Sequence, residues 1–183
     1  AATHYYEKDN YYVNADSTQH ANSEWYGKGA EELKLLGEVK KEEFESILEG
    51  DLGNGVELGR KHNTGLVHAP GIDLTFSAPK SVSIQAEVFG DVRINEAHRA
   101  AVLKALGFIE KNLVQTRKME NGELIWEKTS NITAALFKHN VSRSLDPQLH
   151  THCVLANTTK RNDNEWRSAF FGKIFANKML LGQ

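Results

Sequence analysis

Residues 132–157 constrain the fold most strongly, because they have the pattern of two strands joined by a tight turn. The segments 132–142 and 149–157 are rich in residues that favour extended structure, and Leu145-Asp146-Pro147 between them is a turn sequence. A connection this short joins antiparallel neighbours. We therefore expect a β-hairpin here, within a sheet whose strands are largely antiparallel.

The other segments alternate between strand and helix patterns. Residues 72–76 alternate apolar and polar side chains, as a half-buried strand does, and Val102, Leu106 and Ile109 recur on one helix face. Ser77 can cap the next helix, with Pro79 in its first turn. Helices are expected at 30–36, 40–49, from Ser77 to about 89, 95–117 and 171–181, with short strands at 124–128 and 166–169 and a loop over 50–65. The expected class is α+β, a central and mostly antiparallel sheet flanked by helices.

The bulk properties exclude several classes of protein. At 183 residues the chain can form one domain with a buried core. It has no run of about 18 apolar residues, so no membrane insertion is expected. The N-terminus lacks the pattern of a secretory signal, and the lone Cys153 excludes an internal disulfide, which fits a cytoplasmic protein.

Charge is distributed unevenly along the chain, although the formal net charge is only −2. Residues 1–60 hold 6 Lys or Arg against 13 Asp or Glu, whereas residues 61–183 hold 16 against 11. The C-terminal two-thirds can therefore present a basic surface to phosphates. Solvated charges spread over all faces would give the same counts.

Three histidines fall on the expected hairpin. His150 and His152 are two apart, so a strand points both to one face, and His139 lies across the turn on the neighbouring strand. Three neutral imidazoles converging on one face suit a catalytic divalent ion with open coordination positions. Surface histidines, hydrogen-bonded histidines or a structural zinc site remain alternatives.

Asp73 lies in the middle of the apolar strand 72–76, where an unpaired buried carboxylate would be costly. A carboxylate that accepts the N–H of a metal-bound histidine would account for its position. It could instead accept the proton of an incoming hydroxyl. Alternation equally allows Asp73 to face solvent.

Four tyrosines lie in two adjacent pairs near the start of the chain: Tyr5, Tyr6, Tyr11 and Tyr12. A phenol with a pKa of about 10 attacks poorly unless a base or metal assists it. A metal that binds a phosphate oxygen would supply that help, and the product would be a phosphotyrosine and a free sugar hydroxyl. Aromatic packing or a platform for stacked bases is the alternative reading of doubled tyrosines.

Four segments carry a family resemblance in chain order. They closely resemble conjugative relaxases of the TrwC/TraI (MobF) type, which are HUH single-strand DNA endonucleases. The segments are His-Tyr-Tyr-Glu-Lys-Asp-Asn-Tyr-Tyr at 4–12, Trp-Tyr-Gly-Lys-Gly-Ala-Glu-Glu-Leu at 25–33, Asp-Leu-Thr-Phe-Ser-Ala-Pro-Lys-Ser-Val-Ser at 73–83 and Pro-Gln-Leu-His-Thr-His at 147–152. Thr151 occupies the nominally hydrophobic middle position of the last motif.

The resemblance implies an activity and roles for these residues. Such enzymes nick one strand at a plasmid's origin of transfer, form a 5′-phosphotyrosine and rejoin strands when transfer ends. It implies that Tyr5 attacks first, that Tyr11 serves a second strand transfer, and that Tyr6 and Tyr12 support them. The metal ligands would be His139, His150 and His152, the metal Mg²⁺ or Mn²⁺, and Asp73 the residue that orients a ligand histidine and assists tyrosine deprotonation.

The resemblance also implies partners. These are single-stranded origin DNA, a helicase domain C-terminal to this one, accessory proteins of the relaxosome and the coupling protein of a type IV secretion system. Residues 1–183 would form a relaxase domain that is incomplete at both ends. Rolling-circle replication initiation and non-catalytic, metal-dependent binding of single-stranded DNA are the competing functions.

Contacts to DNA are expected from cations near the start of a helix, the hairpin turn and the edge of the sheet. The candidates are Lys80, Arg143, Lys160, Arg161 and Arg167. Trp126 and Trp166 could stack on bases, or could pack in the core.

Overall fold

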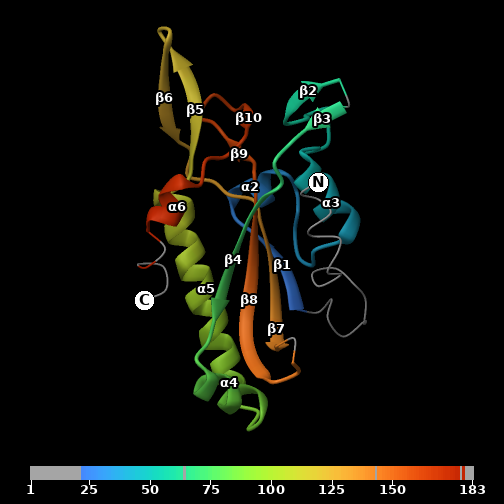
Figure 1. Cartoon of the computed structure of the whole chain (residues 1–183), viewed down its shortest axis with the longest axis vertical. Helices are drawn as coiled ribbons and strands as arrows, with labels where there is room; N and C mark the ends of the chain where they lie inside the picture. The colour runs from blue at the N-terminus through green and yellow to red at the C-terminus, as the bar shows by residue number, and fades with distance from the viewer. Residues whose placement is uncertain (1–21, 64, 143, 178, 180–183) are drawn as a thin grey trace.

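A four-stranded antiparallel sheet forms the centre of the chain in this computed structural model, which describes residues 22–63, 65–142, 144–177 and 179. Its strand order is β1-β7-β8-β4, with β1 Ser23–Tyr26, β7 Ala134–Val141, β8 Pro147–Ala156 and β4 Gly71–Ser77. Every neighbouring pair runs antiparallel. The expected α+β class, with helices flanking a central antiparallel sheet, is confirmed (Figure 1).

The hairpin expected from residues 132–157 is present as β7 and β8. Ala134 pairs with Leu155 and His139 with His150, and a register shift follows between His139 and Val141. On the other side of β8, β4 pairs from Gly71 with Ala156 to Ser77 with His150. β8 is therefore an interior strand of the sheet.

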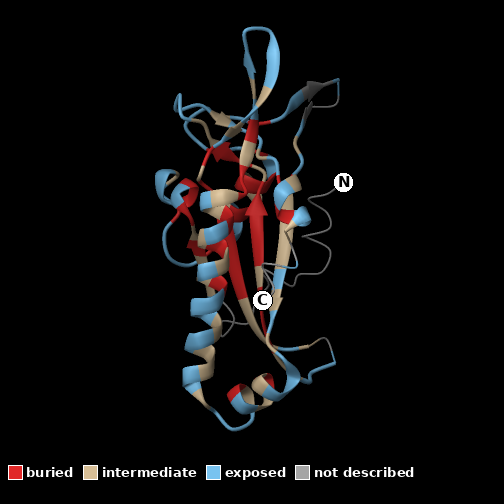
Figure 2. Ribbon diagram, turned by 90° about the vertical axis from the view of Figure 1, so that its left-hand side faces the viewer, coloured by how far each residue is buried: buried red, intermediate tan, exposed pale blue. Residues whose placement is uncertain are grey.

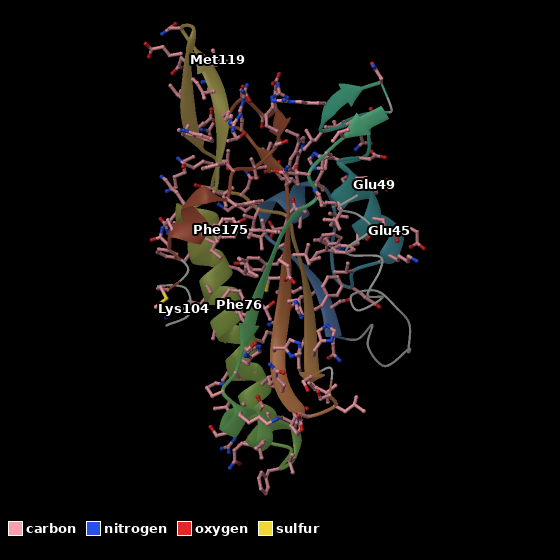
Figure 3. The ribbon with its side chains drawn as sticks, viewed as in Figure 1. Glu45, Glu49, Phe76, Lys104, Met119 and Phe175 are labelled. Atoms are coloured by element: carbon pink, nitrogen blue, oxygen red, sulfur yellow. The ribbon has the colours of Figure 1, made fainter. Side chains whose placement is uncertain are left out.

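Each face of the sheet has its own apolar core. One face packs on α5 (Val92–Asn112), where Val102, Leu106 and Ile109 form the buried stripe expected from their spacing. In Figure 3 the side chain of Phe76 lies between β4 and α5. The other face packs on α3 (Lys41–Glu49) through Phe44, whose ring contacts Phe137 edge-on at a centroid distance of 5.3 Å.

Burial is concentrated in the middle of the sheet (Figure 2). The two ends of the molecule differ in what they carry. At one end lie the β7–β8 turn and α4 (Lys80–Glu87), and at the other lie two small hairpins (Figure 1). These hairpins are β2 (Arg60–His62) with β3 (Gly65–Val67), and β5 (Gln115–Glu120) with β6 (Glu123–Lys128).

The longest helix, α5, begins and ends before the expected bounds of 95 and 117. The Asp91 side chain caps it by accepting a hydrogen bond from the Arg93 backbone N–H, and the helix ends at Asn112. Residues 115–117 instead belong to β5, which turns back into β6 at Asn121-Gly122. Both turn residues have positive φ, as a two-residue hairpin turn requires. Met119 near this turn projects at the tip of the ribbon (Figure 3).

Several smaller expectations need correction. Ser77 does not cap α4, because Pro79 takes the cap position and no side chain caps that end. Strand β1 was not expected, and the expected loop over 50–65 contains β2 and the start of β3. The remaining elements are α2 (Lys28–Glu32), shifted from 30–36, β9 (Thr159–Lys160) paired with β10 (Trp166–Arg167), and α6 (Gly172–Ala176). None of the described helices has the length and apolarity to cross a membrane.

Candidate metal and nicking site

His139, His150 and His152 lie on one face of the β7–β8 hairpin. His139 pairs directly with His150, and His152 is the next residue on that face of β8, opposite Phe137. Ring centroids are 5.3 Å apart for His139 and His150, 5.5 Å for His139 and His152, and 5.2 Å for His150 and His152. The three imidazoles therefore form a nearly equilateral group.

Hydrogen bonds orient two of the three rings, and in each ring the bonded atom is Nδ1. His152 Nδ1 is 2.8 Å from Asp73 Oδ2 on β4 and 3.2 Å from Thr75 Oγ1, and His150 Nδ1 is 2.9 Å from the Gln148 carbonyl oxygen. A carboxylate or carbonyl that accepts from Nδ1–H fixes the tautomer in which Nε2 is the ligand atom. Both histidines are thus arranged to present Nε2.

Asp73 reaches this site because β4 lies beside β8. Asp73 pairs with Val154 and Thr75 with His152, so all of these side chains share the histidine face. The geometry brings Asp73 to a ligand candidate and not out to solvent, with a side-chain exposure of 20%. Sequence reasoning missed Thr75, although the alternation that placed Asp73 also places Thr75 on the same face.

Partial burial favours the neutral form of two imidazoles, those of His139 and His150, by lowering the pKa of each. Desolvation, followed by the neighbouring His150 and His152, lowers the pKa of His139 to about 4. Burial likewise lowers the pKa of His150, opposed in part by its hydrogen bond to Gln148. A metal binds the neutral form of imidazole. At neutral pH these two rings can therefore bind an ion without first losing a proton.

Three imidazoles on one face are suitable ligands for a divalent metal ion, although their nitrogens are not yet at coordination distance from a common point. No group of three or more His, Cys, Asp or Glu donors in the described part of the chain already has the spacing of a finished metal site. Centroid separations of 5.2–5.5 Å leave the rings room to turn inward about an ion. His139, His150 and His152 are the residues that could hold it, with Asp73 outside them.

The start of β1 lies beside this group. Ser23 pairs with Phe137, which in turn pairs with His152, so all three residues stand in one row of the histidine face. The first residue of β1 therefore lies in the same row of the sheet as His152. Tyr5, Tyr6, Tyr11 and Tyr12 precede Ser23 in the chain and lie outside the described residues.

The expected DNA contacts fall in two places, and Arg143 lies outside the described residues. Lys80 is exposed at the start of α4, at the same end as the histidines. The remaining three lie at or near β9 and β10, about 20 Å farther along β8 at 3.3 Å per residue. Each of them is ion-paired: Lys160 with Glu32, Arg161 with Asp163 and Glu165, and Arg167 with Glu165.

The two tryptophans considered for base stacking differ in burial: Trp126 is exposed and Trp166 is half-buried, and both contact neighbouring side chains. Trp126 packs on Phe170 with ring centroids 4.3 Å apart, and Arg117 lies over its ring at 5.5 Å. Lys160 lies 5.9 Å from the centre of the Trp166 ring. Both indoles thus have side-chain partners, but neither is buried in the core, so the expected alternative of core packing does not hold for them.

Comparisons with known proteins agree with the backbone fold described above. The TrwC relaxase family matches residues 1–183. The multifunctional conjugation protein TraI of Escherichia coli K12 is 42% identical over 192 residues, which cover 100% of this chain and 11% of TraI. A copper-bound structure of conjugative relaxase TrwC in complex with oriT DNA has a TM-score of 0.87 at 40% identity, covering 98% of this chain and 62% of that one. A metal-bound TrwC complex with oriT DNA has a TM-score of 0.83 at 42% identity, covering 99% and 61%.

The chain spans only 11% of the curated relative and about three-fifths of the solved TrwC chains. Within that span, family match, sequence identity and backbone similarity coincide over nearly every residue. The chain belongs to the TrwC relaxase family.

Proposed function

We propose that this chain is the strand-nicking part of a conjugative relaxase, which cuts one strand of plasmid DNA at an origin of transfer. The observation that carries the proposal is the group of three histidines on one face of the sheet, with Asp73 bonded to one of them. The TrwC relatives, described as complexes with oriT DNA, support the choice of substrate.

The proposed reaction is a reversible transesterification. A tyrosine Oη, Tyr5 in the first step, forms a bond to phosphorus while the bond from phosphorus to the 3′ oxygen breaks. The phenol loses its proton and the departing 3′ oxygen gains one, so a 5′-phosphotyrosine and a free 3′-OH result. Tyr11 would act in a second strand transfer, with Tyr6 and Tyr12 in support. Rejoining is the same step in reverse, because one phosphodiester is exchanged for another.

His139, His150 and His152 would hold the metal ion, which we propose is Mg²⁺ or Mn²⁺. When bound, a divalent ion neutralises charge on the scissile phosphate as phosphorus becomes five-coordinate. Asp73 accepts from His152 and thereby holds that ring in the tautomer with Nε2 as ligand. We propose that its carboxylate also assists removal of the tyrosine proton, as the family resemblance implies.

Recognition of the DNA would use the basic C-terminal two-thirds. Lys80 lies at the histidine end and is the candidate for a phosphate near the cut. Lys160, Arg161, Arg167 and Arg143 are proposed as more distant phosphate contacts. In the cell we propose a cytoplasmic protein that acts with a C-terminal helicase domain, relaxosome accessory proteins and a type IV secretion coupling protein.

A covalent-adduct assay tests this function. The protein is incubated with a 5′-labelled or 3′-labelled single-stranded origin oligonucleotide and Mg²⁺ or Mn²⁺, then separated on a denaturing gel. The proposal predicts an adduct that retains the label 3′ of the cut, and its loss in the Tyr5→Phe/Tyr11→Phe variant. Metal-dependent DNA binding without an adduct would instead favour a non-catalytic binding module. An undiminished adduct in the double variant would overturn the assignment of the nucleophiles.

A further inference from the structure

The two faces of β8 are packed differently at the histidines. Opposite them, Leu149, Cys153 and Leu155 are fully buried on the α5 side. Thr151 lies among them and is 6% exposed, yet it borders a cavity of about 330 Å³ between the sheet and the first half of α5. Polar residues, among them Asn95, His98, Arg99, Glu24 and Lys138, line the cavity together with the apolar Val102 and Leu136. Apolar packing is therefore interrupted directly behind the residue that separates His150 from His152.

A hydrogen bond takes the place of that packing. His98 Nε2 on α5 and Thr151 Oγ1 are 3.0 Å apart and share a hydrogen bond across 53 residues of sequence. A buried hydroxyl without a partner is costly, so this contact contributes more than an exposed one would. Threonine is stiff at χ1, and a fixed hydroxyl therefore also fixes the backbone of residue 151.

The residue on the other side of His150 is held by the neighbouring helix. The Leu149 backbone N–H donates to Ser83 Oγ at 3.0 Å, and this hydroxyl donates to the Pro79 carbonyl oxygen at 3.1 Å. Ser83 is fully buried on α4. Both neighbours of His150 are therefore bonded to helices through side chains.

These helix contacts lie beside the point where the sheet ladder becomes irregular. The register of β7 with β8 shifts between His139 and Val141, and the pairing of β4 with β8 ends at Ser77 and His150. One more backbone bond follows on the β4 side, where the Ala78 N–H donates to the Leu149 carbonyl oxygen at 2.9 Å. The two helix contacts therefore add to the sheet pairing on either side of His150.

We propose that His98 is a positioning residue for the metal site. Its hydrogen bond to Thr151 sets the β8 backbone between His150 and His152, and through it the spacing of the two rings. The inference rests on the proposed function, because it takes those rings as ligands of one ion. His98 lies behind the sheet and acts through Thr151, without touching the ion or the DNA.

The test measures metal binding separately from stability. Thr151→Val removes the hydroxyl at constant shape, and His98→Leu removes its partner. Mn²⁺ affinity is measured by calorimetry, Co²⁺ absorption reports coordination geometry, and thermal unfolding of the metal-free protein reports stability. Each variant is expected to bind Mn²⁺ about tenfold more weakly, as for loss of an indirect partner of a metal ligand, and to change the Co²⁺ spectrum.

Two further variants separate positioning from general damage. Thr151→Ser keeps the hydroxyl and is expected to restore affinity to near the wild-type value. Arg99→Met removes the ion pair of Arg99 with Glu24 on another wall of the same cavity, and is expected to leave affinity unchanged. The double variant Thr151→Val/His98→Leu is expected to bind no more weakly than either single variant, because both remove one bond.

The outcomes distinguish this inference from the function on which it rests. Wild-type protein that binds no Mn²⁺ would overturn the metal site, and the positioning role with it. Wild-type binding with unchanged affinity and spectrum in Thr151→Val or His98→Leu would overturn the positioning role alone, even if those variants melt at a lower temperature.

Discussion

The two ends of strand β8 are built by opposite means. At the end near β9, Val154, Leu155 and Ala156 are almost completely buried between the two apolar cores. At the other end, His150 and His152 have hydrogen-bonded rings, and Thr151 is bonded to His98 of α5 beside a cavity. One strand can therefore be packed in the core over half of its length and carry candidate metal ligands, His150 and His152, on the other half. Stability and chemistry are then separable by mutation.

The largest effect on stability is expected from Leu155→Ala, because Leu155 is fully buried beside the α5 stripe. Such a truncation costs about 2–5 kcal/mol of unfolding free energy through lost burial and the cavity left behind. Urea denaturation measures this loss. Mn²⁺ affinity of the folded fraction should remain near wild type, and a parallel collapse of affinity would contradict the separation of the two ends.

The reciprocal variant is His150→Ala at the polar end. It should abolish measurable Mn²⁺ binding or weaken it by more than about 100-fold. Loss of a residue that only bonds to a ligand costs up to about 100-fold, and loss of the ligand itself should cost more. Cleavage of origin DNA should fall with it. The metal-free protein should lose some stability because the His150 ring is buried, but less than Leu155→Ala loses, because the ring buries less apolar surface. Metal binding that survives His150→Ala would remove this residue from the ligand set.

A smaller loss is expected from Asp73→Asn. The side chain keeps its size, but the carboxylate that accepts from His152 Nδ1 loses its charge. Metal affinity should drop by about 10- to 100-fold, as for other partners that orient a ligand histidine. Thr75→Val, which removes the longer 3.2 Å contact to the same nitrogen, provides the matched comparison and should have the lesser effect.

The last expected effect is a pH dependence of stability that arises at the polar end. The pKa of His139 is lowered to about 4 in the folded protein, below its ordinary value of 6.5, so the unfolded chain binds more protons between these values. Unfolding free energy of the metal-free protein should therefore fall as pH decreases from 6.5 to 4, and this contribution should be constant above 6.5. Urea titrations at several pH values should show that unfolding free energy depends less steeply on pH in His139→Gln across that window. Equal slopes in both proteins would show that the proton uptake belongs to other groups.

Sequence patterns predicted the parts of the fold that depend on local periodicity. The β7–β8 hairpin follows from two extended segments and a turn, and the α5 stripe from the spacing of Val102, Leu106 and Ile109. Strand β1 was missed because Ser23–Tyr26 is only four residues long and depends on its partner β7. The end of α5 was placed too late, because pairing of β5 with β6 around Asn121-Gly122 takes residues from 115 onward.

The candidate site divides in the same way. Strand alternation alone predicts that His150 and His152 point to the same face. The predicted hairpin then places His139 beside them on the neighbouring strand. The sequence predicted that Asp73 accepts from a ligand histidine, but its particular partner His152, 79 residues away, is given only by the structure. No local signal indicated His98 or Ser83, because their bonds to Thr151 and Leu149 depend on how α4 and α5 pack on the sheet. Such tertiary contacts have no periodic signature.

The most direct test of the account is the position of the metal. Crystals of the protein soaked with Mn²⁺ should give one anomalous peak within about 2.0–2.3 Å of a ring nitrogen of each of His139, His150 and His152, the range of metal–nitrogen bonds. Asp73 should stay bonded to His152 and remain outside the ligand set. A peak that contacts fewer than three of these rings, or lies elsewhere in the protein, would contradict the proposed site.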